Sequence, residues 1–175
     1  MKKTIAVIFL AGTVALGAAP LLEGFGKVTR SGNLELWGLN MGAEQRKMVK
    51  ISLVKNEAGK DVMTVDGKEY KNNIPVRHTK GFLCKAGDKI VVTADVKVVG
   101  SFGITLHKYA KDGLLLSQAQ KFRLMNRKTP VKFEFVLTEP AGKTLYRVNP
   151  VLEFPGKGVS TAENLKIELI PATPK

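Results

Sequence analysis

The amino-acid sequence predicts an all-β fold, a two-sheet antiparallel β-sandwich of the jelly-roll type. Short runs in which apolar and polar residues alternate recur along the chain, and this period of two is typical of strands with one buried face. Gly, Pro, Asn and Asp separate the runs. No stretch sustains the period of a helix, although residues 43–48 could form one helical turn. Roughly eight to ten short strands in one domain favour two stacked sheets.

The N-terminus has the order of a secretory signal peptide. Met1-Lys2-Lys3 is basic, residues 4–19 carry no charge, and the small residues Gly17-Ala18-Ala19 end the segment. The alternative is an uncleaved membrane anchor, but a helix of residues 4–19 would reach only about 24 Å across a hydrocarbon core of roughly 30 Å. We therefore expect residues 1–19 to be removed, and the protein to be exported to the periplasm, the cell surface or the medium.

The rest of the chain is the size of one domain. Residues 20–32 are rich in Gly and charge and are predicted to form an N-terminal leader or an edge strand, and residues 33–175 are predicted to form the sandwich. A domain of this length can bury enough surface to fold without a disulfide or a metal. Cys84 is the only cysteine, so no disulfide can form within the chain.

Residues 88–99 are the clearest predicted strand. Five apolar residues occupy one face of it, namely Ile90, Val92, Ala94, Val96 and Val98. Residues 49–53, 131–137 and 165–169 alternate in the same way. Asp112-Gly113 lies between residues 102–110 and 114–124, and because Asp-Gly is a favoured two-residue turn, these two segments are predicted to form a hairpin.

The formal net charge is +13, or +11 without Lys2 and Lys3. Such a charge favours polyanionic partners. For an exported protein these are acidic polysaccharide or anionic lipid, and we expect no nucleic-acid partner. The alternative, which the sequence leaves open, is that the lysines only confer solubility, because they are spread along the chain.

Six segments in the second half of the chain follow one another in a recognisable order. They are the turn and strand of residues 86–96, the strand and Asp-Gly turn of 106–113, the aromatic strand of 131–135, the loop Thr138-Glu139-Pro140, the Arg-x-x-Pro-x-Leu strand of 147–152, and the strand start of 163–167. In this order they resemble the jelly-roll carbohydrate-binding modules appended to bacterial glycanases, which are part of the galactose-binding-like superfamily.

This resemblance covers about half of the chain, from Ala86 to Leu169, and implies a jelly-roll fold and sugar binding. The superfamily also hosts adhesion and accessory domains, so the fold alone does not determine the function. Where the family commonly has an aspartate that feeds a structural calcium site, this chain has Glu163-Asn164.

No pattern in the sequence indicates catalysis, a cofactor or a metal site. His78 and His107 are the two histidines, and neither has a His or Cys partner at metal-ligand spacing. No serine lies in a Gly-x-Ser-x-Gly motif, and none of the fifteen acidic residues stands out as half of a glycosidase pair. We therefore predict that the protein is not an enzyme and that it uses no cofactor.

A sugar site needs an aromatic surface beside groups that hydrogen-bond to hydroxyls, and residues 102–110 offer both. If Ile104 and Leu106 face the core, Thr105, His107 and Tyr109 stand together on the other face of the strand. The alternative is that Tyr109 packs at a sheet edge and that His107 is merely solvated.

Three further residues are candidate ligand contacts. Arg147 and Asn149 share a face of a later strand, and on the concave face of a jelly roll they would line one cleft with the residues above, where arginine suits a carboxylate or a sulfate. Trp37 is the only tryptophan, and its alternation with Leu34 and Leu36 predicts that it lies away from the core. The alternative for Trp37 is a buried position between the sheets.

The sequence thus predicts a non-catalytic exported module that binds a polysaccharide or glycoconjugate, with a bias toward anionic glycans. The alternative function is a structural or accessory envelope protein, whose basic sandwich makes peripheral contact with the envelope through protein partners, anionic lipid or lipopolysaccharide.

Overall fold

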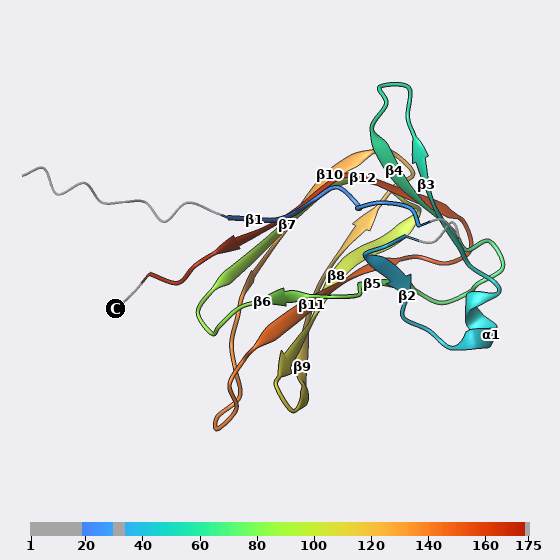
Figure 1. The fold of residues 1–175 in the computed structure, drawn as a ribbon. Helices are drawn as coiled ribbons and strands as arrows, with labels where there is room; N and C mark the ends of the chain where they lie inside the picture. The colour runs from blue at the N-terminus through green and yellow to red at the C-terminus, as the bar shows by residue number, and fades with distance from the viewer. Residues whose placement is uncertain (1–18, 30–33, 174–175) are drawn as a thin grey trace, which may run out of the picture.

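The computed structural model describes residues 19–29 and 34–173, which form two antiparallel β-sheets packed as two layers (Figure 1). The first sheet contains, in spatial order, β10 (Thr129–Val136), β7 (Lys89–Lys97), β12 (Val159–Ile170), β4 (Asp61–Asp66) and β3 (Lys50–Lys55), and β1 (Ala19–Glu23) also pairs with β12. The second sheet contains β2 (Trp37–Leu39), β5 (Ile74–His78), β11 (Arg147–Phe154), β8 (Gly100–Ala110) and β9 (Gly113–Leu124), and β6 (Phe82–Leu83) also pairs with β11. The predicted two-sheet β-sandwich is confirmed.

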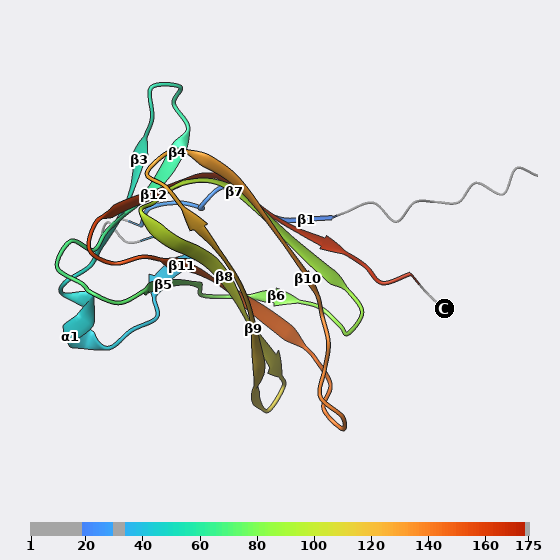
Figure 2. The ribbon, with the colours of Figure 1, turned by 180° about the vertical axis from the view of Figure 1, so that it is seen from behind.

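The alternating runs of the sequence became strands because each buries one face. Residues 88–99 contain β7, residues 131–137 contribute most of β10, and residues 165–169 lie within β12. The predicted hairpin is formed by β8 and β9, and β9 is the last strand of its sheet (Figure 2). The expected helical turn is α1 (Ala43–Arg46), which lies between β2 and β3 in the chain. No helix of the described part is long and apolar enough to span a membrane.

The predicted signal peptide, residues 1–19, lies outside the described residues except for Ala19. Ala19 begins β1, and this strand is antiparallel to β12 with Leu22 opposite Ile167. The first strand of the sandwich therefore begins where the predicted signal peptide ends.

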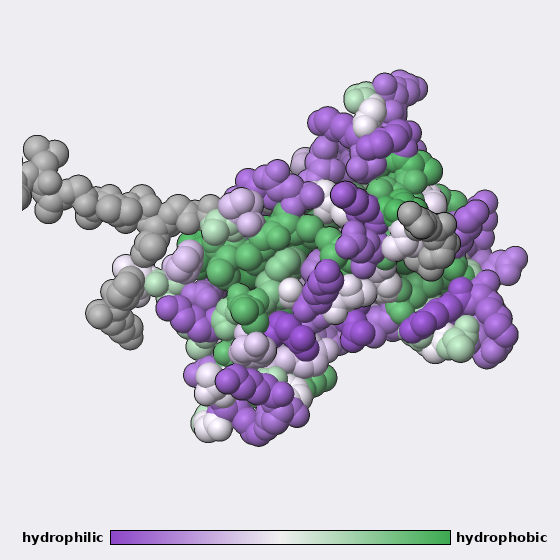
Figure 3. Space-filling model, viewed as in Figure 1, coloured by the Kyte–Doolittle hydropathy of each residue, from purple (hydrophilic) through white to green (hydrophobic). Residues whose placement is uncertain are grey.

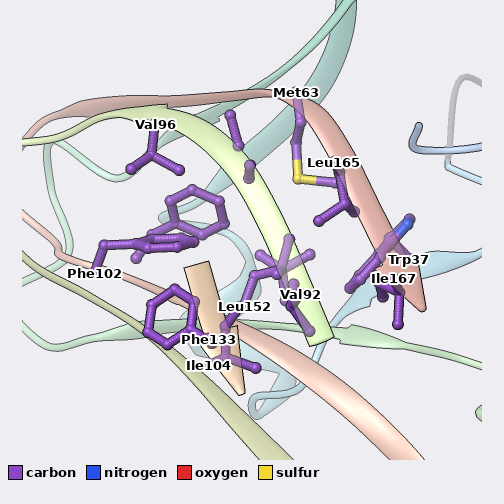
Figure 4. Packing of buried hydrophobic residues seen from close by; sticks show 14 of the residues in the cluster. Trp37, Met63, Val92, Val96, Phe102, Ile104, Phe133, Leu152, Leu165 and Ile167 are labelled. Atoms are coloured by element: carbon purple, nitrogen blue, oxygen red, sulfur yellow. The ribbon is translucent and has the colours of Figure 1, made fainter. Parts of the chain in front are cut away.

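The core lies between the two sheets. Phe133 of β10 is buried against two aromatic rings of the second sheet, with ring centroids 6.0 Å from Phe102 and 4.9 Å from Phe122. Aliphatic side chains from both sheets fill the space around these rings (Figure 4). Since the inner faces are occupied by this packing, the outer faces, the edges and the loops are left for binding.

Candidate functional site

The predicted ligand contacts on β8 and β11 lie on two hydrogen-bonded neighbours within the second sheet. Tyr109 is opposite Arg147, His107 is opposite Asn149, and Thr105 is opposite Val151. Because the alternating residues of β8 are buried in the core, this row points to the outer face of the sheet. The structure therefore brings Thr105, His107, Tyr109 and Arg147 together on one face, and their binding of a ligand stays a prediction.

Arg147 and Tyr109 form a cation–π contact on this face. The guanidinium carbon of Arg147 lies 5.1 Å from the centroid of the Tyr109 ring, and both residues are half-buried. Arg147 Nε is buried and has no hydrogen-bond partner among the described residues. The planar cation of Arg147 therefore lies over one face of the Tyr109 ring.

Burial and neighbouring charges shift the pKa values of two groups on this face, His107 and Glu153. Burial, and secondarily the charge of Arg77, lower the pKa of His107 below its usual value, so the imidazole is neutral near pH 7. Burial raises the pKa of Glu153, partly offset by nearby Lys121 and by a hydrogen bond with Thr105. The face therefore combines the hydrogen-bonding groups of Thr105, His107 and Glu153 with the cations of Arg77 and Arg147.

Arg77 and Glu153 were missed by the sequence analysis. Arg77 lies opposite Val151, and Glu153 lies opposite Gly103, so both share the outer face with His107. The signal that could have found Arg77 is the alternation of residues 74–78, but Pro75 interrupts that run, and proline within a run argues against a strand.

Asn149, the other predicted ligand contact on β11, is buried and not open on this face. Its side chain is only 4% exposed, and its Nδ2 donates a hydrogen bond of 2.9 Å to the carbonyl oxygen of His78. The turn after β5 covers it, with Gly81 so close that an added Cβ would lie 2.5 Å from Asn149 Oδ1. Strand alternation assigned Asn149 to the correct face, but it could not reveal that a distant turn packs on that face.

The prediction that Trp37 lies exposed on the surface is wrong. Trp37 is 3% exposed, stands edge-on to His78 with ring centroids 5.2 Å apart, and belongs to the hydrophobic core (Figure 4). The alternation that suggested exposure began at Leu34, but β2 begins only at Trp37, so the pattern did not belong to one strand. Trp37 is therefore a core residue at the sheet edge.

The residues at Glu163 do not fit a calcium site of the kind that is common in the family that the sequence resembles. Glu163 Oε1 lies 2.6 Å from Lys128 Nζ, and Glu163 Oε2 accepts a hydrogen bond of 3.0 Å from Asn56. The next residue, Asn164, donates to Asp95. Calcium requires six to eight oxygen ligands, whereas an ammonium group already contacts this carboxylate. Within the described ranges, no group of three or more His, Cys, Asp and Glu residues could hold a metal ion.

Comparison with protein-family models and with curated proteins finds no match. Solved structures with the same fold include the CBM22-1 xylan-binding domain of Xyn10C from Paenibacillus barcinonensis, with a TM-score of 0.57 and 14% identity over 91% of this chain and 99% of that chain. The likeness shows the fold. At this level of identity it shows no shared function.

Two other similar structures differ from each other in their named roles. The CBM22-1–GH10 modules of endo-1,4-beta-D-xylanase 10B from Clostridium thermocellum, complexed with xylohexaose, match with a TM-score of 0.55 and 15% identity over 90% of this chain and 29% of that chain. A cyclase from Fischerella sp. TAU matches with a TM-score of 0.59 and 14% identity over 90% of this chain and 100% of that chain. The same fold therefore occurs in binding modules and in cyclases, so the function must be argued from the site.

Proposed function

We propose that this protein is a non-catalytic module that binds a polysaccharide or glycoconjugate on the outer face of its second sheet. The observation that carries the proposal is the alignment of Thr105, His107, Tyr109 and Arg147 on that face. The Tyr109 ring offers an apolar surface for the C–H face of a sugar ring. The neutral imidazole of His107 and the hydroxyl of Thr105 exchange hydrogen bonds with sugar hydroxyls.

The proposal includes a bias toward anionic glycans. Arg77 and Arg147 stand on the same face, and a planar guanidinium matches the two oxygens of a carboxylate or a sulfate. The formal charge of +13 attracts polyanions over a longer range. Export of the protein would bring it into contact with such glycans.

The similar structures support a carbohydrate ligand by analogy. One is named as a xylan-binding domain, and another was solved as xylanase modules with xylohexaose. Because a cyclase has the same fold, the fold alone does not imply glycan binding, and binding must be tested by experiment.

A glycan array read at physiological salt and at about 1 M salt tests the proposal. The long-range charge contribution is screened within about 8 Å in the first condition and about 3 Å in the second, so it weakens, whereas stacking and hydrogen bonding persist. We expect Tyr109→Ala and His107→Ala to remove the salt-resistant binding. The matched control is Tyr146→Ala, which removes an exposed tyrosine that also lies beside a cation, Lys111.

Unchanged binding in the Tyr109→Ala and His107→Ala variants would rule out this face as the site. The accessory envelope protein, with its basic surface on anionic lipid or on a protein partner, would then be the better account.

A further inference from the structure

A pocket lies at the edge of the sandwich formed by β2 and β3, away from β8. It has a volume of about 650 Å³, and its lining includes Trp37 of β2 together with Val49 and Ile51 at the start of β3. β2 and β3 end their respective sheets, so the two sheets are not hydrogen-bonded to each other here. On this side of the molecule, near β2, Figure 3 shows small hydrophobic patches among hydrophilic residues. This volume is in the range of pockets that enclose small organic ligands.

Three cations surround this apolar lining. They are Arg46 of α1, Lys50 of β3 and Arg77 of β5, and no acidic residue is among the described residues that line the pocket. Within the part of the chain that the structure describes, none of the three forms an ion pair. Like charges that converge without a counter-charge repel one another, so an anion bound among them is stabilised.

The exposed guanidinium of Arg46 makes one hydrogen bond to the backbone. Its Nε donates a hydrogen bond of 2.9 Å to the carbonyl oxygen of Met41, and this contact leaves the two terminal nitrogens for another acceptor. A guanidinium that already makes one such contact loses less conformational entropy when it binds a carboxylate than a free side chain does.

Trp37 supplies an independent observation. Its Nε1–H is buried and has no hydrogen-bond partner among the described residues, and Trp37 is one of the residues that line the pocket. An unpaired buried donor is costly, and a polar group that enters the pocket could accept this hydrogen bond.

From these observations we propose that the pocket between β2, α1 and β3 binds a small amphipathic anion, a carboxylate carried on an aliphatic or aryl body. The apolar body lies against Trp37, Val49 and Ile51, and the carboxylate meets the guanidinium of Arg46. This site is separate from the proposed glycan face and shares only Arg77 with it, so either site can be present without the other.

The test is a titration of the full-length protein with octanoate and with 4-phenylbutanoate, followed by Trp37 fluorescence and by calorimetry. Trp37 is the only tryptophan and is one of the residues that line this pocket, so the emission comes from a single position. We expect saturable one-to-one binding of at least one of the two anions. Acetate, which lacks the apolar body, and octylammonium, which has the opposite charge, should produce no saturable change.

Two arginine variants locate the site. Arg46→Gln should weaken the binding of the anion about tenfold, which is about 1.4 kcal/mol. Arg123→Gln removes the same charge from an exposed position on β9 and should leave the affinity unchanged. Tyr109→Ala should also leave it unchanged, which distinguishes failure of this site from failure of the glycan site.

Three results would overturn the proposal. One is the absence of saturable binding for both octanoate and 4-phenylbutanoate. The second is equal binding of octanoate and octylammonium, because the cations would then play no part. The third is an equal loss of affinity in Arg46→Gln and Arg123→Gln, because only the overall charge would then matter.

Discussion

His78 is a buried histidine that joins several parts of the second sheet. Its ring stacks on Phe82 with centroids 4.6 Å apart, and its Nδ1 accepts a hydrogen bond of 3.0 Å from the backbone N–H of Gly81. Burial, and secondarily the charge of Lys80, lower the pKa of His78 from 6.5 to about 4. The imidazole is therefore neutral in the folded protein at pH 5, where an unfolded histidine is mostly protonated.

This lowered pKa predicts acid sensitivity. Between pH 6.5 and about 4 the unfolded state binds more protons than the folded state, so the free energy of unfolding falls as the pH falls through this window. We expect urea denaturation to show a loss of about 1–2 kcal/mol between pH 7 and pH 5. His78→Phe should remove most of this difference, and an equal loss in that variant would assign the sensitivity to other groups.

Gly81 and Gly59 allow a matched test of the turn that covers Asn149. Both have a positive φ, +69° and +74°, so alanine strains the backbone at either position by about 1 kcal/mol or more. At Gly81 the new methyl group would also lie 2.6 Å from the carbonyl oxygen of Val148, whereas at Gly59 it meets nothing within 4 Å. In thermal or urea unfolding, Gly81→Ala should be less stable than Gly59→Ala by about 2 kcal/mol. Equal stabilities would mean that the turn does not pack tightly on Asn149.

The residues of the candidate site were only partly predictable from the sequence. Alternation along one strand was enough to group Thr105, His107 and Tyr109, because side chains two apart share a face. It did not predict the burial of Asn149 and Trp37, because the burial of each depends on segments that are distant in the sequence. Arg77 could not be identified without the strand pairing that brings β5 beside β11.

Among the elements, the strands with long alternating runs were predictable and the short ones were not. β7 and β10 repeat a buried residue at every second position, which is a strong local signal. β5 contains Pro75, and β6 is only two residues long, so neither carries that signal. The order of the strands in each sheet comes from tertiary packing, and local periodicity contains no information about it.

Lys128 lies in the connection before β10 and forms an ion pair with Glu163 of β12. The Glu163 side chain is 12% exposed, so removing the ammonium leaves a largely buried carboxylate with less compensation. Lys128→Met should lower the free energy of unfolding by about 1–2 kcal/mol. Lys132→Met breaks an exposed pair with Glu134 and should change it by less than about 1 kcal/mol.

A calcium chelator tests whether the partner of Glu163 is the Lys128 ammonium or a metal ion. The ion pair predicts that addition of EDTA leaves the unfolding temperature unchanged. A chelator-dependent drop in that temperature, restored by calcium, would contradict our assignment of Lys128 as the partner of Glu163.

For the whole molecule, the predicted export has a consequence for the mature N-terminus. Strand β1 begins at Ala19, so cleavage close to this residue would keep nearly all of the strand that pairs with β12. We expect the intact mass of protein from its native host to correspond to a chain that begins near Ala18 or Pro20. A membrane-extracted chain that retains Met1 would instead indicate an anchor.

The central claim is that the outer face of the second sheet binds a glycan, and an NMR titration tests it most directly. The isotope-labelled protein would be titrated at about 1 M salt with the glycan that gives the strongest array signal, since that salt suppresses long-range attraction by scattered lysines. The account predicts saturable shifts confined to Arg77, residues 105–109 and Arg147, and their loss in Tyr109→Ala but not in Tyr146→Ala. Shifts that spread over the exposed lysines, or that lie on the first sheet while residues 105–109 stay unchanged, would contradict it.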